Sequence, residues 1–254
     1  MSETSRHQQI LENREFLKHI ESEEEFETDQ QLRKPQPPLY KEARADHAVI
    51  QLPTNYRDLP ISGDVLTLIE TRKSDRVFKQ TAMTLLELSY LLWVTQGVKE
   101  IRGKNYATIR NVPCGGARHE FETYLLIANV ETLEPGAYHY LPEQHSLEYL
   151  HPEEHPAVML DQLFCKQTWT AKGSVGFFWS IIPYRAEWRY DIYAHRIALV
   201  DIGHVGENLY LGAHSIGLGS CGIGAYDQKL VDPYFELDAQ NEYILYSASV
   251  GTLK

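Results

Sequence analysis

The chain has 254 residues, of which 43% are hydrophobic and 23% charged, and its formal net charge is −11 at pH 7. This composition is ordinary for a globular protein, and the length fits one large domain or two small ones. The negative charge argues against a nucleic-acid-binding protein, because such proteins present a basic face to the phosphates. The polar N-terminus and the lack of a long apolar run predict neither a signal peptide nor a membrane span.

Residues 1–45 are predicted to form an N-terminal arm. They are acidic and then proline-rich (KPQPPLYK), and they show little apolar periodicity beyond a short helix expected near residues 8–20. The composition allows both a disordered arm and an arm that wraps a partner subunit. The packed domain is expected over residues 46–254, because no later linker divides it.

Two helices and three strands are expected next. Helical periodicity lies in GDVLTLIETRKS and then in TLLELSYLLWVTQG, where Thr84 and Glu87 have the spacing of a capping box. Gly97 is placed to end the second helix. The pattern then changes to strands in TYLLIANV, GAYHYL and SLEYL, which are separated by turn residues.

The C-terminal half begins with a short helix around VMLDQLFC and an apolar strand, SVGFFWSII. The longest helix is expected over residues 194–216, where apolar residues recur at spacings of three and four. Another face of this helix carries Gly203, Gly206 and Ala213, which predicts a close contact with a second helix. Two strand-like segments, SCGIGAY and EYILYSASVG, follow. Helices and strands mix without regular alternation, so the predicted class is α+β.

A basic cluster, TRKSDR, contains Arg72, Lys73 and Arg76 around Ser74. One interpretation is a solvated helix C-terminus, where cations are favoured by the helix dipole. The other is an anion site, in which guanidinium groups and a hydroxyl grip a phosphate. Spacing alone favours neither interpretation.

Two glycine-rich stretches also have both a structural and a ligand-binding interpretation. Gly115 and Gly116 are adjacent in RNVPCGGARHEF, and four glycines punctuate GLGSCGIGAY. Glycine permits a tight turn, and it also lets another group approach the bare backbone. Neither stretch has the strand–glycine–helix order of a dinucleotide fingerprint or a Walker loop.

No metal site is expected. HPEEHP is typical of a solvated acidic turn, and the histidines His195, His204 and His214 are nine or ten residues apart on the long helix. The three scattered cysteines Cys114, Cys165 and Cys221 fit reduced thiols and a cytoplasmic location.

Three segments together resemble the SagB-type branch of the nitroreductase-like flavoproteins: ETRKSDRVF, IRNVPCGGARHEFETYLLIANVETLEPGAYHYLPEQHSLEYL and LVDIGHVGENLYLGAHSIGLGSCGIGAY. The resemblance extends over most of the chain in the same order. It implies a nitroreductase-like α+β fold, with a central antiparallel sheet flanked by helices, in a homodimer that binds FMN at the subunit interface. The implied activity is hydride transfer between NAD(P)H and an organic acceptor through bound FMN.

The resemblance also implies roles for particular residues. An Arg-x-Ser-x-Arg motif would hold the FMN phosphate and ring, and Arg76 would stabilise negative charge at the flavin N1 and C2 carbonyl. Cys114 stands where serine is common, and Ala117 where asparagine is frequent. The implied cofactor contacts are Arg72, Lys73, Ser74 and Arg76, then Pro113, Cys114, Gly115 and Gly116 from the other subunit, the backbone of Gly222, Ile223 and Gly224, and Lys254 as a C-terminal phosphate contact.

Three functions remain open within this resemblance. The first is a general FMN-dependent oxidoreductase. The second is a dehydrogenase that oxidises azolines to azoles in a modified peptide, so the substrate is either a small molecule or a peptide. The third is a flavin-binding protein without NAD(P)H turnover.

Overall fold

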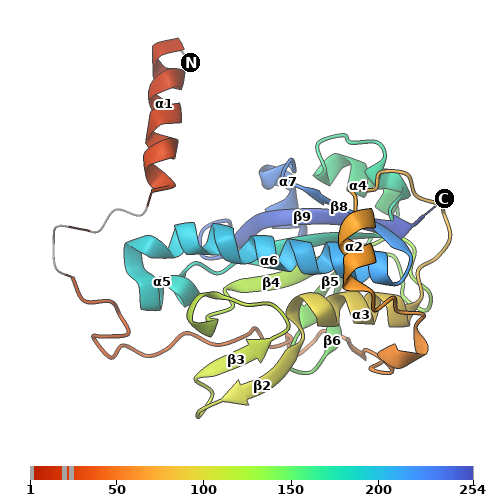
Figure 1. Cartoon of the computed structure of the whole chain (residues 1–254), viewed down its shortest axis with the longest axis horizontal. Helices are drawn as coiled ribbons and strands as arrows, with labels where there is room; N and C mark the ends of the chain where they lie inside the picture. Colours follow the sequence, from red (N-terminus) through yellow and green to blue (C-terminus); the bar gives the residue numbers. More distant parts are fainter. Residues whose placement is uncertain (1–2, 19–21, 23–25, 254) are drawn as a thin grey trace.

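A seven-stranded antiparallel sheet forms the centre of the protein (Figure 1). The computed structural model describes residues 3–18, 22 and 26–253. The strand order is β1-β6-β5-β4-β7-β9-β8, and each neighbouring pair is antiparallel. The strands are β1 (Val49–Gln51), β4 (Phe121–Ile127), β5 (Gly136–Leu141), β6 (Ser146–Pro152), β7 (Val175–Ile181), β8 (Leu218–Ile223) and β9 (Tyr243–Thr252).

Helices cover both faces of the sheet, which confirms the predicted α+β class with a central antiparallel sheet between helices. The helices are α1 (Glu3–Phe16), α2 (Val65–Thr71), α3 (Leu85–Gln96), α4 (Pro156–Leu163), α5 (Tyr184–Tyr190), α6 (Ala194–Ser215) and α7 (Gln228–Tyr234). Side chains of α3 and α6 share one core with the sheet, and those of α4 and α7 share the other. No helix among the described residues combines the length and the apolar character needed to cross a membrane.

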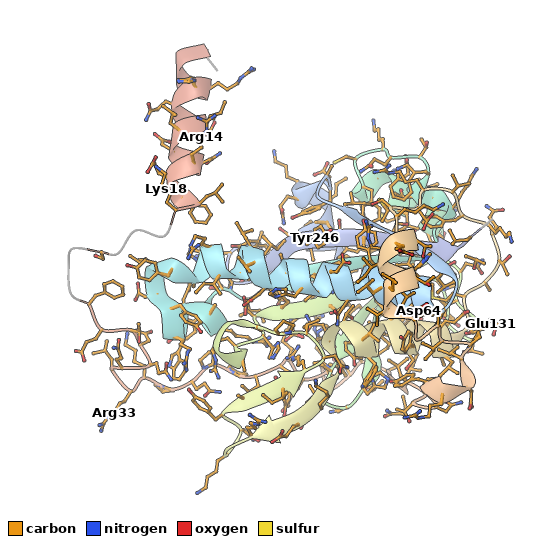
Figure 2. The ribbon with its side chains drawn as sticks, viewed as in Figure 1. Arg14, Lys18, Arg33, Asp64, Glu131 and Tyr246 are labelled. Atoms are coloured by element: carbon orange, nitrogen blue, oxygen red, sulfur yellow. The ribbon has the colours of Figure 1, made fainter. Side chains whose placement is uncertain are left out.

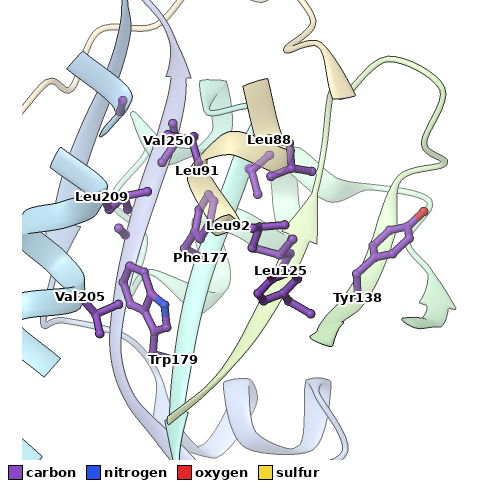
Figure 3. Close-up of a cluster of buried hydrophobic side chains, with 14 of the residues drawn as sticks. Leu88, Leu91, Leu92, Leu125, Tyr138, Phe177, Trp179, Val205, Leu209 and Val250 are labelled. Atoms are coloured by element: carbon purple, nitrogen blue, oxygen red, sulfur yellow. The ribbon is translucent and has the colours of Figure 1, made fainter. Parts of the chain in front are cut away.

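The central strands supply side chains to both cores. On β4, Leu125 contributes to the α3–α6 core and Leu126 to the α4–α7 core, because successive side chains of a strand point to opposite faces. Phe177 and Phe178 of β7 divide in the same way. Figure 3 shows Leu125 and Phe177 on the α3 side, near Leu92. Burial on both faces explains the apolar runs YLLI in β4 and VGFFW in β7.

The predicted capping box at the start of α3 is confirmed. The Glu87 backbone N–H donates to Thr84 Oγ1 at 3.2 Å, and the Thr84 N–H donates to a Glu87 carboxylate oxygen at 2.7 Å. Gly97 ends the helix, as expected, and is its C-cap residue. Its φ is −57°, so this residue is not in the left-handed conformation.

The long helix α6 packs on α3, as the small residues predicted, but the position of the close approach differs. A Cβ at Gly212 would lie 2.7 Å from Val94 of α3. Gly206 faces Tyr246 of β9 instead, and Gly203 faces open space. The small residues on α6 therefore allow close packing against strand β9 as well as against helix α3.

A two-stranded hairpin, β2 (Val98–Arg102) and β3 (Ala107–Arg110), lies beside the main sheet and was not anticipated from the sequence. The β2 sequence VKEIR is mostly exposed and has no regular alternation. Helices α5 and α7 and the strand β1, each of seven residues or fewer, were also not expected from the sequence.

The N-terminal arm has two parts. Helix α1 projects away from the body, where Figure 2 shows Arg14 and Lys18 at its side. The later part lies against the packed domain: the Lys41 N–H donates to Glu122 at 3.0 Å, and the Arg44 N–H donates to Glu148 at 2.9 Å. The helix of the arm was expected near residues 8–20; it begins earlier, at Glu3, and ends at Phe16.

Candidate functional site

The basic cluster of residues 72–76 follows helix α2. Asp64 caps the start of this helix by accepting the Leu66 N–H at 3.1 Å, and Arg72 is the capping residue at its end. The chain beyond runs along the edge strand β8, where the Asp75 N–H donates to the Ser220 carbonyl at 2.9 Å. Four exposed or half-exposed side chains, Arg72, Lys73, Ser74 and Arg76, are thereby held at this edge of the sheet.

Tyr210 of α6 connects this cluster to the glycine-rich strand β8. Its hydroxyl lies 3.0 Å from Ser74 Oγ and accepts the Gly222 N–H at 2.6 Å. The Arg72 guanidinium sits over the Tyr210 ring, 5.2 Å from the centroid. The structure therefore brings the sequence-predicted residues Arg72, Ser74 and Gly222 together. Sequence reasoning missed Tyr210, because nothing in the helix pattern distinguishes it from other half-buried residues.

The cluster carries excess positive charge. Neither Arg72 nor Arg76 forms an ion pair with another described residue, and Lys73 Nζ lies 3.6 Å from Asp75. The Arg76 guanidinium is 5.9 Å from the centre of the Trp169 ring. A pocket of about 400 Å³ opens here, lined by residues 73–77 and Leu253. Cations without carboxylate partners beside a pocket favour an anionic ligand.

Four predicted cofactor contacts lie in the C-terminal part of the chain, at Gly222, Ile223, Gly224 and Lys254. Gly222 has a local packing reason to be glycine, because a side chain would collide with the Tyr246 hydroxyl. Ile223 is buried in the α4–α7 core, so only its backbone could serve a ligand. Gly224 is exposed and faces open space. Lys254 lies outside the described residues, directly after Leu253 of the pocket.

The segment Pro113–Gly116 lies at a different place, against the first half of α6. The Gly115 N–H donates to Asp201 at 2.7 Å. Gly116 has φ +56°, and a Cβ there would meet Arg189 at 2.6 Å and the Tyr190 hydroxyl at 2.7 Å. Contacts within the chain therefore explain the paired glycines, because they form a tight turn that includes a left-handed residue and packs closely on its neighbours.

The two groups of predicted site residues are separate within one chain. Gly115 contacts Asp201, and Ser74 contacts Tyr210, nine residues further along α6. At about 1.5 Å per residue, roughly 13 Å of helix lies between the two contacts. A ligand that touches both groups at once in one chain would have to span this length.

Cys114 belongs to a buried acidic cluster that the sequence did not reveal. Its thiol donates to Glu120 Oε2 at 3.2 Å, and Asp201 lies close to both. Burial, joined by the charge of Asp201, raises the pKa of Glu120 to about 7. Burial and the charges of Glu120 and Asp201 raise the pKa of Cys114 well above its usual range.

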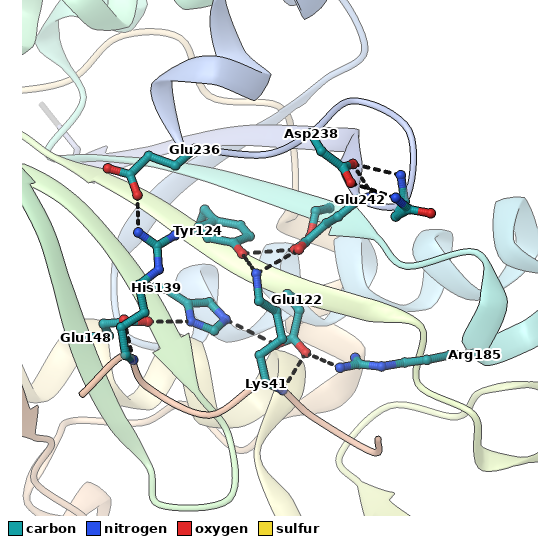
Figure 4. A network of polar contacts seen from close by, with 12 residues as sticks. Lys41, Glu122, Tyr124, His139, Glu148, Arg185, Glu236, Asp238 and Glu242 are labelled. Carbon is teal, nitrogen blue, oxygen red and sulfur yellow. Dashed lines mark hydrogen bonds and ion pairs between the residues drawn. The ribbon is translucent and has the colours of Figure 1, made fainter. Parts of the chain in front are cut away.

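A larger pocket, of about 960 Å³, lies between residues 36–42 of the arm, the turn at 104–106 and the loop 236–242. None of the predicted cofactor residues lines it. Two ion pairs lie beside it: Lys41 Nζ is 2.7 Å from Glu242, and Arg185 is 2.6 Å from Glu122 (Figure 4).

The same buried network extends through His139. Its two ring nitrogens lie 3.2 Å from Glu122 and 3.0 Å from Glu148. Burial alone would lower the pKa of His139, but hydrogen bonds to the two carboxylates raise it. Burial would raise the pKa of Glu148, whereas hydrogen bonds from His139 and the Arg44 N–H lower it to about 2. The network ties the arm to the sheet.

Comparison with solved structures places this fold among known proteins. The chain superposes on a structure from Ralstonia eutropha named as a nitroreductase with a TM-score of 0.67, at 23% identity over 87% of this chain and 94% of that one. A similarly named structure from Anabaena variabilis gives 0.64 at 22% identity, over 84% of this chain but only 45% of its own.

Two further structures carry bound molecules in their names. The Escherichia coli microcin synthetase McbBCD complex with truncated pro-MccB17 bound gives a TM-score of 0.61, at 22% identity over 73% of this chain and 72% of that one. A Desulfovibrio desulfuricans nitroreductase structure in complex with FMN gives 0.52, at 14% identity over 76% and 87% of the two chains.

Sequence comparison identifies the family. A protein of Methanocaldococcus jannaschii that bears the name nitroreductase is 32% identical over 160 residues, which are 63% of this chain and 78% of that protein. The model of the nitroreductase family matches residues 69–252, which include the basic cluster, the Pro113–Gly116 segment and strand β8. The chain therefore belongs to the nitroreductase family.

Proposed function

We propose that the protein is an FMN-dependent oxidoreductase that transfers hydride between NAD(P)H and an organic acceptor. The observation that carries this proposal is the arrangement around Tyr210, where the Arg72 guanidinium and the Ser74 hydroxyl meet the backbone of Gly222. A cationic pocket in a chain of net charge −11 opposes the overall field, which favours a specific anion such as a phosphate.

The residues present fit a phosphorylated flavin. Arg72 and Lys73 would bind the phosphate, and Ser74 would add a hydroxyl donor. Arg76 would stabilise negative charge at the flavin N1 and C2 carbonyl. The exposed backbone at Gly224 offers an approach without a side chain in the way. Bound FMN supplies the hydride chemistry, and the protein supplies position and electrostatics. Lys254 would extend the phosphate site.

The proposed flavin site is shared between two subunits. Pro113, Cys114, Gly115 and Gly116 of one subunit would complete the site formed by the basic cluster and the Gly222–Gly224 backbone of the other. The separation of these groups along α6 supports this division.

An exposed apolar surface supports the homodimer. Three side chains of α2, Val65, Leu66 and Ile69, are each more than 60% exposed, and Leu199 and Val200 of α6 are also exposed. Exposed apolar side chains that share one helix, such as those of α2, are typical of a surface that a partner covers.

The first experiment is an absorbance spectrum of the purified protein, followed by identification of the released flavin. We expect a yellow protein that releases FMN and not FAD. Separate anaerobic titrations with NADPH and with NADH follow. At least one of the two should reduce the flavin and bleach its absorbance. A colourless protein that cannot be reconstituted with FMN would refute the cofactor proposal.

A second candidate is an azoline-to-azole dehydrogenase of modified-peptide biosynthesis. The structural similarity to the microcin synthetase complex supports it. Assays with an azoline-containing peptide, with azole formation followed by a mass loss of two hydrogens, distinguish it from general NAD(P)H turnover. A bound flavin that NAD(P)H does not reduce anaerobically and that oxidises no such peptide would favour a flavin-binding protein without turnover.

A further inference from the structure

The acidic cluster beneath the Pro113–Gly116 segment consists of the side chains of Cys114, Glu120 and Asp201. Each side chain offers one potential metal-ligand atom, and these three atoms all lie within 4.8 Å of one another. Glu120 is 1% exposed and Asp201 is 5% exposed, while Cys114 is half-buried. The loop that precedes β4 supplies Cys114 and Glu120, and α6 supplies Asp201. The cluster therefore forms where this loop packs against the helix.

These groups lack the positive charge that would balance them. No lysine or arginine among the described residues forms an ion pair with Glu120 or Asp201. The nearest cationic candidate to Asp201 is His204, with its Nδ1 3.9 Å away. Arg185, whose charge also reaches Glu120, is engaged with Glu122 at 2.6 Å. Asp201 accepts the Gly115 N–H at 2.7 Å, but that neutral donor does not balance a carboxylate charge. Buried carboxylates without a nearby cation are unfavourable, because burial removes their hydration.

A second observation comes from Glu120 itself. One of its carboxylate oxygens, Oε2, accepts from the Cys114 thiol, but the other, Oε1, is buried and has no hydrogen-bond partner in the described part of the chain. The nearby Glu120 backbone amide interacts with the carboxylate but does not satisfy Oε1. A buried acceptor within a set of potential metal ligands points to a missing cation.

We propose that Cys114, Glu120 and Asp201 bind a divalent transition-metal ion of the Zn²⁺ type. One thiolate and two carboxylates suit Zn²⁺, Co²⁺ or Fe²⁺, whereas Mg²⁺ and Ca²⁺ prefer oxygen ligands alone. Three protein ligands leave a fourth position for water, and the half-buried Cys114 gives the ion a route from solvent. On binding, the Cys114 thiol releases its proton to solvent and the thiolate sulfur bonds to the metal.

Cobalt provides the test, because a thiolate ligand to Co²⁺ gives a charge-transfer absorption that oxygen ligands do not give. Metal-stripped protein, both free of flavin and loaded with FMN, is titrated with Co²⁺. We expect a thiolate band that is absent from Cys114→Ser and present in the matched control Cys165→Ser, since Cys165 is exposed and outside the cluster. Glu120→Gln and Asp201→Asn keep the side-chain size and should each weaken Co²⁺ binding at least tenfold.

A measurement on the unmodified protein guards against variants that fail to fold. Zn²⁺ should slow alkylation of Cys114 by iodoacetamide and leave Cys165 unaffected, as read by peptide mass spectrometry. No Co²⁺ or Zn²⁺ binding up to millimolar concentration would overturn the proposal. A thiolate band that persists in Cys114→Ser would also overturn the proposal. The same holds if neither Glu120→Gln nor Asp201→Asn changes the affinity for Co²⁺. Flavin binding has its own readouts, so the two proposals can fail separately.

Discussion

The hydroxyl of Tyr210 lies 3.0 Å from the Oγ of Ser74, and this contact joins helix α6 to the basic segment that follows α2. The same hydroxyl accepts the Gly222 N–H from β8. A single side chain on α6 therefore sets the spacing between two segments that lie almost 150 residues apart in the sequence. This relationship positions the cations of the proposed FMN site.

Arg72→Ala should weaken FMN binding about ten- to a hundredfold, because a charge-assisted hydrogen bond contributes roughly 1.5–3 kcal/mol. Flavin fluorescence during titration measures the affinity. The matched control is Arg102→Ala, an exposed arginine of β2 paired with Glu100, which should bind FMN normally. Equal affinity in both variants would assign Arg72 to an ordinary helix end.

Tyr210→Phe should lower both stability and FMN affinity. Removing the hydroxyl leaves the Gly222 N–H and the Ser74 hydroxyl without their partner, at a cost of about 1–3 kcal/mol. Urea unfolding of the flavin-free protein and FMN titration report the two effects. Tyr184→Phe serves as the control, since its hydroxyl contacts Asp29 in the arm. A variant that loses stability but keeps full FMN affinity would mean that Tyr210 is structural only.

Gly116→Ala should destabilise the flavin-free protein by about 1–2 kcal/mol, because a left-handed backbone disfavours any Cβ. The new Cβ would also crowd Arg189 and Tyr190. Gly63→Ala is the comparison, since nothing lies within 4 Å of a Cβ at Gly63. Thermal unfolding and FMN affinity are measured in parallel. If only affinity fell, the backbone at Gly116 would serve the cofactor and not the packing of the loop.

Dimerisation and FMN binding should be a single linked equilibrium. Ile69→Glu places a charge on the exposed apolar surface of α2, so it should weaken the dimer and release FMN together. Sedimentation across a dilution series, with flavin fluorescence followed in parallel, measures both. Val158→Glu, at an exposed position of α4, should change neither. Tight FMN binding by a folded monomer would show that the site is not shared.

Acid should loosen the arm by protonating Glu148. Its pKa is about 2 in the folded protein against an ordinary value of 4.5, so the stabilisation is complete above pH 4.5 and is lost as the pH falls toward 2. The loss should amount to about 2–3 kcal/mol. His139 acts in the opposite direction, because a raised pKa gives stabilisation that is lost as the pH rises through it.

Urea unfolding as a function of pH tests this prediction. Glu148→Gln should flatten the acid limb of the stability curve. Glu131→Gln, at an exposed position labelled in Figure 2, should leave the limb unchanged. An acid limb that is identical in both variants would show that Glu148 does not contribute to it.

Elements with long or chemically distinctive patterns could be predicted from the amino-acid sequence. Helix α6, the apolar strands β4 and β7 and the capping box at Thr84 follow from local periodicity and hydrogen-bonding chemistry. The family resemblance indicated that the basic cluster and the glycine-rich segments form the cofactor site. Short elements such as α7 and the exposed strand β2 lack such patterns, since only tertiary packing stabilises them.

Which of these residues meet depends on the tertiary packing. It placed Tyr210 between Ser74 and Gly222, and it brought Asp201 to Cys114 and Glu120 from 81 or more positions away in the chain. It also showed that the Tyr246 hydroxyl leaves no room for a side chain at Gly222. Contacts of this kind depend on how the helices pack across the sheet, and no local pattern along the chain records that packing.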